Sequence, residues 1–307
     1  MTIPNLPSFV DIHKDVLNAL NSGTPIVALE STIITHGMPF PDNVEMASSV
    51  ETLICNNGVV PATIAVIDGR IKIGLTSNEL TQLAKVKNAL KISRADMAFA
   101  ISQGKTAGTT VAATMIIARM AGIRIFATGG IGGVHRGAET NFDISADLTE
   151  LGKTDVLVVA AGAKAILDVP KTLEVLETQG VPVVGYQTDS LPAFWTRESN
   201  LDVPLRMDST SQISDFMKVR DELNLNSGIL IANPIPEIDE IPAKTINNYI
   251  EKAQAEMENN NISGKQVTPF LLKRIFELSN GSSLISNIAL VKNNAYVAAK
   301  IAKNFYK

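Results

Sequence analysis

Short apolar runs alternate along this chain with segments whose apolar residues recur at helical spacing. The runs predict six strands, at residues 25–29, 62–67, 123–128, 155–161, 181–186 and 228–233. Strands that alternate with helices in this way are typical of α/β folds with a mainly parallel sheet. We therefore predict such a fold for this chain.

One pair of strands carries a hairpin signal. Asp68-Gly69 joins the strand at 62–67 to the apolar stretch RIKIGL that begins at Arg70. Because Asp-Gly favours a tight two-residue turn, these two segments should pair antiparallel. The predicted sheet is therefore mixed.

Several residues mark where helices should begin and end. Thr76 followed by Glu79, and Asp42 followed by Glu45, resemble capping boxes. Pro170 suits the first turn of a helix. Three amphipathic segments each end at a glycine that suits the end of a helix, namely Gly58, Gly122 and Gly180.

The C-terminal part differs from the rest. After Pro242 the pattern is helical to the end of the chain, with breaks at 259–261 and at Asn280-Gly281. No repeat, low-complexity tract or linker divides the sequence. We therefore predict a single domain, 1–307, with a helical C-terminal part.

Composition excludes several classes of protein. Of the 307 residues 45% are hydrophobic and 19% are charged, which suits a globular chain with a large core. A net charge of −4 without clustered basic residues argues against a nucleic-acid partner. Arg119 and Arg124 interrupt the longest apolar stretch, so no membrane span is expected. The single Cys55 and the absence of a recognised targeting segment fit a cytoplasmic protein.

Lys164 is the first candidate for chemistry. It follows the apolar run at 156–163, so a lone ammonium stands where a buried strand gives way to a helix. Desolvation there would lower the pKa of the amine and make it a nucleophile able to form a Schiff base. The alternative is a lysine that extends from the edge of the sheet into water.

Glu30 is the second candidate. It directly follows the strand at 25–29, and strand ends are where open α/β sheets bind ligands. A carboxyl group there could serve as a general acid or base. A salt bridge or a helix cap would equally explain it.

A glycine-rich stretch, TGGIGGVHRG, runs from Thr128 to Gly137. Its backbone amides could approach a phosphate or carboxylate, and His135 with Arg136 could add donors and charge, although such a stretch is more often only a turn. Asp143, Ser145 and Asp147 then alternate, which would place them on one side if the segment is extended. Asp147 could equally cap the helix that follows.

Two further features could hold ions. Asp143 alone cannot bind a divalent metal tightly, but Mg²⁺ or Mn²⁺ can sit on one carboxylate when waters and substrate complete the shell. No cysteine or histidine spacing indicates zinc. Lys91, and a turn at Gly108-Thr109-Thr110 that opens an apolar helix, could receive an anion.

Most of the candidate residues above fall within eight longer sequence blocks, which are ALESTIITHGMPFPDNVEMA, PATIAVIDGRIKIGL, GTTVAATM, ATGGIGGVHRG, FDISADLTEL, AGAKAILDVPKTLEVLETQGVPVVGYQTDSLPAFW, IANPIPE and SNIALVKNNA. Taken together, these blocks resemble the pseudouridine-5′-phosphate glycosidase family over nearly the whole chain.

The resemblance implies a three-layer α/β/α enzyme, a pseudouridylate synthase of hydro-lyase type, that assembles as a homotrimer. It implies reversible conversion of pseudouridine 5′-phosphate to uracil and ribose 5-phosphate in nucleotide catabolism, with one Mn²⁺ per subunit, a place that Mg²⁺ or another divalent ion could take. Lys164 then matches the nucleophile, Glu30 the proton donor and Asp143 the metal-binding position. Substrate contacts match Lys91, Val111, Ser145, Ala146, Asp147 and Asn287, and we add His135 from the glycine-rich stretch.

Two other functions fit parts of the pattern. A class I aldolase would also form a Schiff base with a sugar phosphate, but it would turn over without uracil. A sugar-phosphate-binding protein without activity would keep the glycine-rich turns and would need neither Glu30 nor a reactive Lys164. Some members of the family carry a fused pseudouridine kinase domain, which this chain lacks, so we expect any such kinase to be a separate partner.

Overall fold

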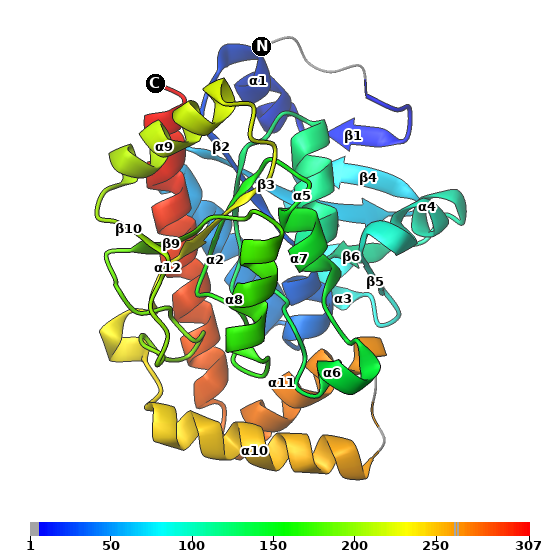
Figure 1. Cartoon of the computed structure of the whole chain (residues 1–307). Coiled ribbons are helices and arrows are strands. Elements are labelled where there is room, and N and C mark those ends of the chain that lie inside the picture. Colours follow the sequence, from blue (N-terminus) through cyan, green and yellow to red (C-terminus); the bar gives the residue numbers. More distant parts are fainter. Residues whose placement is uncertain (1–5, 261, 263) are drawn as a thin grey trace.

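The computed structural model describes residues 6–260, 262 and 264–307 (Figure 1). The described strands are β1 (Val10–Ile12), β2 (Ile26–Leu29), β3 (Val60–Ile67), β4 (Arg70–Ile73), β5 (Leu90–Ile92), β6 (Ala107–Thr109), β7 (Ile125–Ala127), β8 (Leu157–Ala160), β9 (Val183–Tyr186), β10 (Leu205–Met207) and β11 (Ile229–Ala232).

Helices fill most of the rest. They are α1 (Lys14–Ser22), α2 (Asp42–Asn56), α3 (Ser77–Lys85), α4 (Arg94–Ser102), α5 (Val111–Met120), α6 (Ala138–Asn141), α7 (Ala146–Leu151), α8 (Val169–Thr178), α9 (Thr210–Glu222), α10 (Ala243–Asn259), α11 (Val267–Leu278) and α12 (Ser282–Phe305). Three short turns of other helix types are η1 (Ile33–Gly37), η2 (Glu237–Asp239) and η3 (Gly264–Gln266).

The described strands join one sheet in the order β1-β4-β3-β2-β7-β8-β11-β9-β10, and β6 branches from β3 with β5 beside it. Neighbours pair parallel, except that β3 is antiparallel to both β4 and β6. The mixed, mainly parallel sheet is therefore confirmed. The predicted hairpin is confirmed too, because Asp68 and Gly69 have positive φ values of 48° and 74°.

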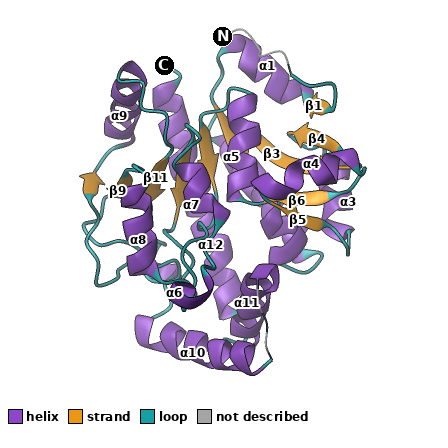
Figure 2. Cartoon of the chain, turned by 45° about the vertical axis from the view of Figure 1, so that its right-hand side comes forward, coloured by secondary structure: helices purple, strands orange, loops and turns teal. Residues whose placement is uncertain are grey.

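Helices cover both faces of this sheet (Figures 1 and 2). α5, α7 and α8 pack in a row on one face, while α2 and α12 contact each other and the central strands on the other. The central strands β2, β7, β8 and β11 are buried along their whole length. This burial on both faces explains why their sequences are continuous apolar runs, and the three-layer α/β/α architecture is confirmed.

All six strands predicted from apolar runs are present, with the hairpin partner β4. The short strands β1, β5, β6 and β10 had no such signal. Each has only three residues, and β1 and β10 lie at the two edges of the sheet, where side chains are partly exposed. A strand of three residues is too short to show an apolar pattern in the sequence.

Helix boundaries follow the sequence with one exception. Thr76 and Glu79 form the predicted capping box at the start of α3. The box at Asp42 is wrong, because Asp42 is already helical and Pro41 occupies the cap position without a side-chain hydrogen bond. The helices after Pro242 are confirmed, with the second break at Asn280-Gly281. The first break ends at residue 261, which lies outside the described residues.

Among the described residues no helix combines the length and the apolar character that a membrane span needs.

Candidate active site

Polar residues gather at the carboxyl edge of the parallel strands. Glu30 directly follows β2, Thr128 follows β7, Asn233 follows β11, and Lys164 lies in the connection between β8 and α8. Residues that are far apart in the sequence therefore meet at the edge where α/β sheets usually bind ligands. The helices α6, α10 and α11 lie at this same end of the molecule (Figures 1 and 2).

A polar pocket of about 280 Å³ opens at this edge. It brings together nine of the ten residues that the sequence singled out, all but Asn287. Its lining residues are Glu30, Thr32, Lys91, Ser93, Thr110, Val111, Gly132, His135, Asp143, Ile144, Ser145, Ala146, Asp147, Lys164, Leu167, Gly264 and Thr268.

An apolar pocket of about 70 Å³ adjoins it. Five residues line both pockets, and they are Glu30, Thr32, Lys91, Lys164 and Thr268. Asn287 lines this second pocket, where its neighbours are mainly apolar groups from η1, α11 and α12. These neighbours include Ile33, Met38, Phe194, Pro269, Leu272, Leu290 and Val291. Glu30 and Lys164 therefore stand on the boundary between a polar and an apolar chamber.

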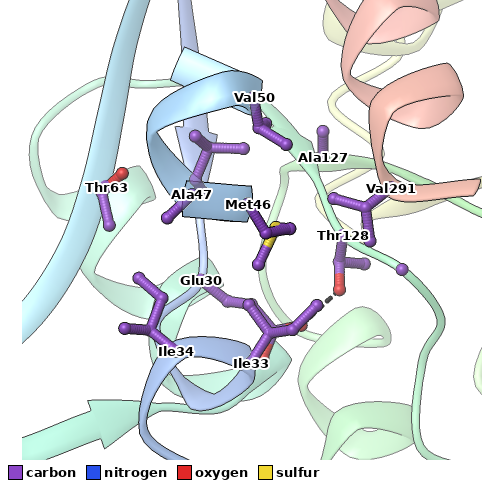
Figure 3. Close-up of a pocket in the computed structure, with 12 residues that line it drawn as sticks. Glu30, Ile33, Ile34, Met46, Ala47, Val50, Thr63, Ala127, Thr128 and Val291 are labelled. Carbon is purple, nitrogen blue, oxygen red and sulfur yellow. Dashed lines mark hydrogen bonds between the residues drawn. The ribbon is translucent and has the colours of Figure 1, made fainter. Parts of the chain in front are cut away.

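Glu30 is held by a hydrogen bond that its sequence context did not reveal. The Thr128 hydroxyl donates to its Oε1 atom across a separation of 98 residues. Figure 3 shows this bond beside a small cavity of about 20 Å³ that is walled by apolar side chains such as Met46 and Val291. Burial raises the pKa of the Glu30 carboxyl, against the opposing effects of Lys164, Thr128 and Lys91. A carboxyl group with a raised pKa is suited to donate a proton.

Lys164 lies where the strand β8 gives way to the helix α8, as the sequence predicted. β8 ends at Ala160, and the Lys164 amide donates to the Ile131 carbonyl in the loop that follows. Its side chain is half-buried, and its charge acts on the Glu30 carboxyl. The amine therefore lies within electrostatic reach of the candidate acid rather than in purely apolar surroundings.

The starts of two helices contribute hydrogen-bond donors to the polar pocket. Ser93 stands at the N-cap position of α4, and Thr110 caps α5, whose first residue is Val111. At the start of α5 the amides of Ala112 and Ala113 already donate to Asp147 and Thr110, so the two hydroxyls, rather than these amides, face the pocket as donors. The hydroxyls of Thr32 and Ser93 are buried and have no hydrogen-bond partner among the described residues. Because such groups are normally satisfied, these hydroxyls indicate a place for a ligand.

Asp147 has a different position from the one predicted. Ser145 caps α7 by accepting from the Asp147 amide, so Asp147 is neither the cap nor part of an extended segment. Its Oδ1 accepts from the amide of Ala112 at 2.9 Å, and its Oδ2 accepts from the amide of Gly132 at 2.8 Å. The buried carboxylate therefore ties α5 to the glycine-rich turn at the pocket wall.

The glycine-rich turn owes its glycines to packing within the protein. A Cβ atom at Gly130 would lie 2.7 Å from the Phe194 ring, and one at Gly132 would lie 2.2 Å from the Ser145 hydroxyl. The close approaches are therefore to the chain's own side chains. This packing explains the glycines, and because Gly132 also lines the polar pocket, contact of the turn with a phosphate or carboxylate stays a prediction.

Asp143 and His135 lie together at the polar pocket. The His135 amide donates to the Asp143 carbonyl at 3.0 Å. Burial lowers the pKa of His135, Lys91 and Lys164 act in the same direction, and Asp143 opposes them. Within the described residues no group of three or more His, Cys, Asp or Glu side chains could hold a metal ion. The donor set fits only a cation that takes most of its ligands from water and substrate.

Comparison with known proteins identifies the family. The model of the family described as "Indigoidine synthase A like protein" matches residues 15–304. A pseudouridine-5′-phosphate glycosidase of Dinoroseobacter shibae is 74% identical over 298 residues, which cover 97% of this chain and 98% of the relative. One of Mesorhizobium japonicum is 61% identical and covers 96% and 97% of the two chains. This chain belongs to the pseudouridine-5′-phosphate glycosidase family.

A solved structure supports the same assignment. The prealnumycin C-glycosynthase AlnA, determined in complex with ribulose 5-phosphate, superposes with a TM-score of 0.90 at 36% identity and covers 98% of each chain. The family resemblance seen in the sequence is therefore confirmed.

Sequence reasoning missed several residues of this glycosidase-like site. Thr128 holds Glu30, Thr32 and Ser93 present unpaired hydroxyls, and His36 lines the apolar pocket. Thr128 had a usable signal, because it is the first polar residue after the strand β7. For Thr32 and His36 the only signal in the sequence was that they lie within six residues of Glu30.

Proposed function

We propose that this chain reversibly cleaves the C–C glycosidic bond of pseudouridine 5′-phosphate to give uracil and ribose 5-phosphate through a Schiff base on Lys164. The observation that carries this proposal is the position of Glu30 and Lys164 on the boundary between the two pockets. An acid and an amine there would face the bond that joins a polar sugar phosphate to a flat base. Family membership supports the same reaction.

The first steps open the sugar ring and attach it to the enzyme. Glu30 gives its proton to O4′, and the C1′–O4′ bond breaks with its electron pair moving to O4′. Electron density from the uracil ring stabilises the electrophilic C1′. Neutral Lys164 then adds through Nζ to C1′ and loses a proton, which Glu30 takes back.

The later steps break the carbon–carbon bond. Glu30 returns the proton to C5 of uracil, and the C1′–C5 bond breaks with its electron pair returning to the ring. C1′ is left as an iminium of Lys164, which water hydrolyses to ribose 5-phosphate and the free amine, and the proton released in this step returns to Glu30. A covalent path is needed because carbon is a far poorer leaving atom than the nitrogen of an ordinary nucleoside.

The pocket chemistry suggests which end of the substrate lies where. Lys91 supplies positive charge, and the hydroxyls of Ser93 and Thr110 supply donors, for the phosphate and ribose. The apolar pocket suits the flat uracil ring, with Asn287 to pair with its imide edge. The Oδ1 atom of Asn287 is buried and has no hydrogen-bond partner in the part of the chain that the structure describes, so it is available to accept from the base.

A divalent cation, Mn²⁺ by family resemblance, would be held by the Asp143 carboxylate at the polar pocket. When bound it would supply electrostatic stabilisation and order water around the substrate. Asp143→Ala should lose most of the activity while its melting temperature stays close to that of the parent. Full activity of this variant in chelator-treated buffer would remove Asp143 from the proposal.

We also propose a homotrimer that acts in the cytoplasm beside a separate pseudouridine kinase. Light scattering of the purified protein would give the oligomeric state directly.

The reaction can be tested with a pair of isomeric substrates. The purified chain should release uracil from pseudouridine 5′-phosphate and spare uridine 5′-monophosphate, because the proposed path needs the uracil carbon on C1′. Equal rates for both substrates would contradict it. Turnover of aldehyde and ketone donors without uracil would instead favour the class I aldolase.

The covalent step can be trapped. Incubation with ribose 5-phosphate and then sodium borohydride should leave one reduced pentose phosphate on Lys164, located by digestion and mass analysis. Lys164→Arg should lose the adduct and at least ~10⁴-fold in kcat, because a guanidinium stays protonated and cannot attack. An adduct on Lys91, or near-normal turnover of Lys164→Arg, would overturn the assignment of the nucleophile.

A further inference from the structure

A chain of buried amides connects the C-terminal helix to the candidate acid. Asn294 of α12 is fully buried, and its Nδ2 donates to the carbonyls of Thr128 at 2.8 Å and of Gly129 at 3.2 Å. Asn233, which is also buried and follows β11, donates to the Asn294 Oδ1 at 2.9 Å. Both the Nδ2 and the Oδ1 atom of Asn294 therefore form hydrogen bonds, which fix the orientation of its side-chain amide.

These bonds act on the segment that carries the partner of Glu30. Thr128 donates its hydroxyl to Glu30 from the point where β7 ends and the glycine-rich turn begins. Gly129 has no side chain of its own to anchor this point, and a Cβ there would lie 3.2 Å from Val291 of α12. α12 therefore packs directly on the turn, as Figure 3 shows for Val291 and Thr128.

We propose that Asn294 is a positioning residue for Glu30, acting through the Thr128 turn, with Asn233 fixing the orientation of its amide. By holding two successive carbonyls, Asn294 keeps the Thr128 hydroxyl aligned with the Glu30 carboxyl group. Asn287 lies about two helical turns before Asn294 on the same helix. The helix α12 therefore carries both Asn294, which holds the Thr128 turn, and Asn287, the predicted contact to uracil. This proposal deepens the proposed function and rests on it for its effect on catalysis.

The effect can be separated from other influences on Glu30. The charged and titratable groups that face it are Lys91 from β5, Lys164 from the β8–α8 connection, Asp147 from α7 and His36 from η1. Asn294 forms its hydrogen bonds with Asn233, Thr128 and Gly129 and with none of these groups. Replacing it should therefore change the Thr128 bond and leave the surrounding charges in place.

The test is a carbon-13 NMR titration of the Glu30 carboxyl in the substrate-free protein, assigned with Glu30→Gln. Thr128→Val should move the midpoint upward by ~1 pH unit, because the lost hydrogen bond had stabilised the carboxylate. Asn294→Leu should move it in the same direction by about half as much. The double variant should move it no further than Thr128→Val alone, because both changes act through one bond. With substrate, Asn294→Leu should lower kcat by roughly 10-fold with little change in KM.

Asn293→Leu is the matched control. Asn293 is the neighbouring residue on α12 and donates to the Pro234 carbonyl at 3.0 Å, so its replacement also removes a bond to a loop carbonyl. It should leave the Glu30 midpoint unchanged. If Asn294→Leu fails to fold, Asn233→Leu provides the second variant and should move the midpoint upward by a smaller amount.

A lower melting temperature of Asn294→Leu with an unmoved midpoint would reduce Asn294 to a structural residue and overturn the proposal. The titration needs no substrate. A parent chain that releases no uracil would therefore contradict the proposed function, while the midpoints would still decide the positioning role.

Discussion

The two pockets that meet at Glu30 and Lys164 differ in chemistry. The polar pocket is walled by groups that donate hydrogen bonds or carry charge, such as Lys91, Ser93 and Thr110. Apart from the residues that both pockets share, the apolar pocket is walled mainly by hydrocarbon, with His36 and Asn287 as polar groups among it. This difference teaches why the proposed reaction places its acid and its nucleophile on the boundary, because the bond to be broken in that proposal joins a sugar phosphate to a flat base.

The position of Glu30 on this boundary also influences whether its carboxyl group is protonated. On the apolar side, burial favours its neutral form, while Lys164, Thr128 and Lys91 favour the carboxylate. A carboxyl group balanced in this way can lose and regain one proton in a single turnover. The predictions below test each side of the boundary, from the largest effect to the smallest.

Glu30→Gln removes the acid at the boundary itself and keeps its shape. We expect kcat for pseudouridine 5′-phosphate to fall by roughly 10²–10⁴-fold. Borohydride should still trap some adduct with free ribose 5-phosphate, since that adduct needs no C–C cleavage. The control is Glu51→Gln, which changes another glutamate that accepts from a threonine but lines a different groove. Its kcat should stay near that of the parent, and a Glu30→Gln variant with comparable kcat would exclude Glu30 as the acid.

Lys91→Met tests the polar side. Loss of a charged donor to the phosphate should lower kcat/KM by roughly 10–100-fold. In the direction of synthesis, KM for ribose 5-phosphate should rise while KM for uracil stays constant. Lys87→Met, which makes the same change at an exposed position outside the pockets, is the matched control. A rise confined to the KM for uracil would reverse the placement of the two ends of the substrate.

Asn287→Leu tests the apolar side. It removes the amide that would pair with the uracil imide and keeps a similar volume. We expect KM for uracil to rise by roughly 5–10-fold, with KM for ribose 5-phosphate unchanged. Asn293→Leu on the same helix should alter neither constant. An equal rise in both constants would show that the two pockets do not divide the substrate as proposed.

The smallest expected effect concerns stability. Because burial raises the folded-state pKa of Glu30, the folded protein holds this proton over a pH range in which the unfolded chain has released it. The contribution of Glu30 to the free energy of unfolding therefore falls as pH rises from the ordinary glutamate pKa through the raised pKa of the folded state. Glu30→Gln should melt at the same temperature as the parent near pH 4 and slightly higher at pH 8, by on the order of 2 °C.

Calorimetry of both proteins at the two pH values would measure this gain. Glu174→Gln, at an exposed position on α8, should show none. A gain that is equal at both pH values would mean that ionisation of Glu30 is not its cause.

Local patterns in the sequence determined much of the fold. The central strands were visible because each is buried on both faces, so that every residue in it is apolar. The Asp68-Gly69 hairpin and the Thr76 capping box were visible because their causes lie within a few residues. Glu30 and Lys164 could be found because a charge beside an apolar run is uncommon, and their roles came from the family resemblance.

The contacts that organise the site were decided by tertiary structure alone. Thr128 lies 98 residues from Glu30, and Asn294 lies 166 residues from Thr128, so no local pattern connects them. Asp147 looked like a cap or part of a strand until two distant backbone amides placed it. The packing reason for the glycines of the turn was hidden until their neighbours Phe194 and Ser145 were known. Sequence shows which residues are unusual for their surroundings, but only the folded chain brings together the partners that give a polar side chain its role.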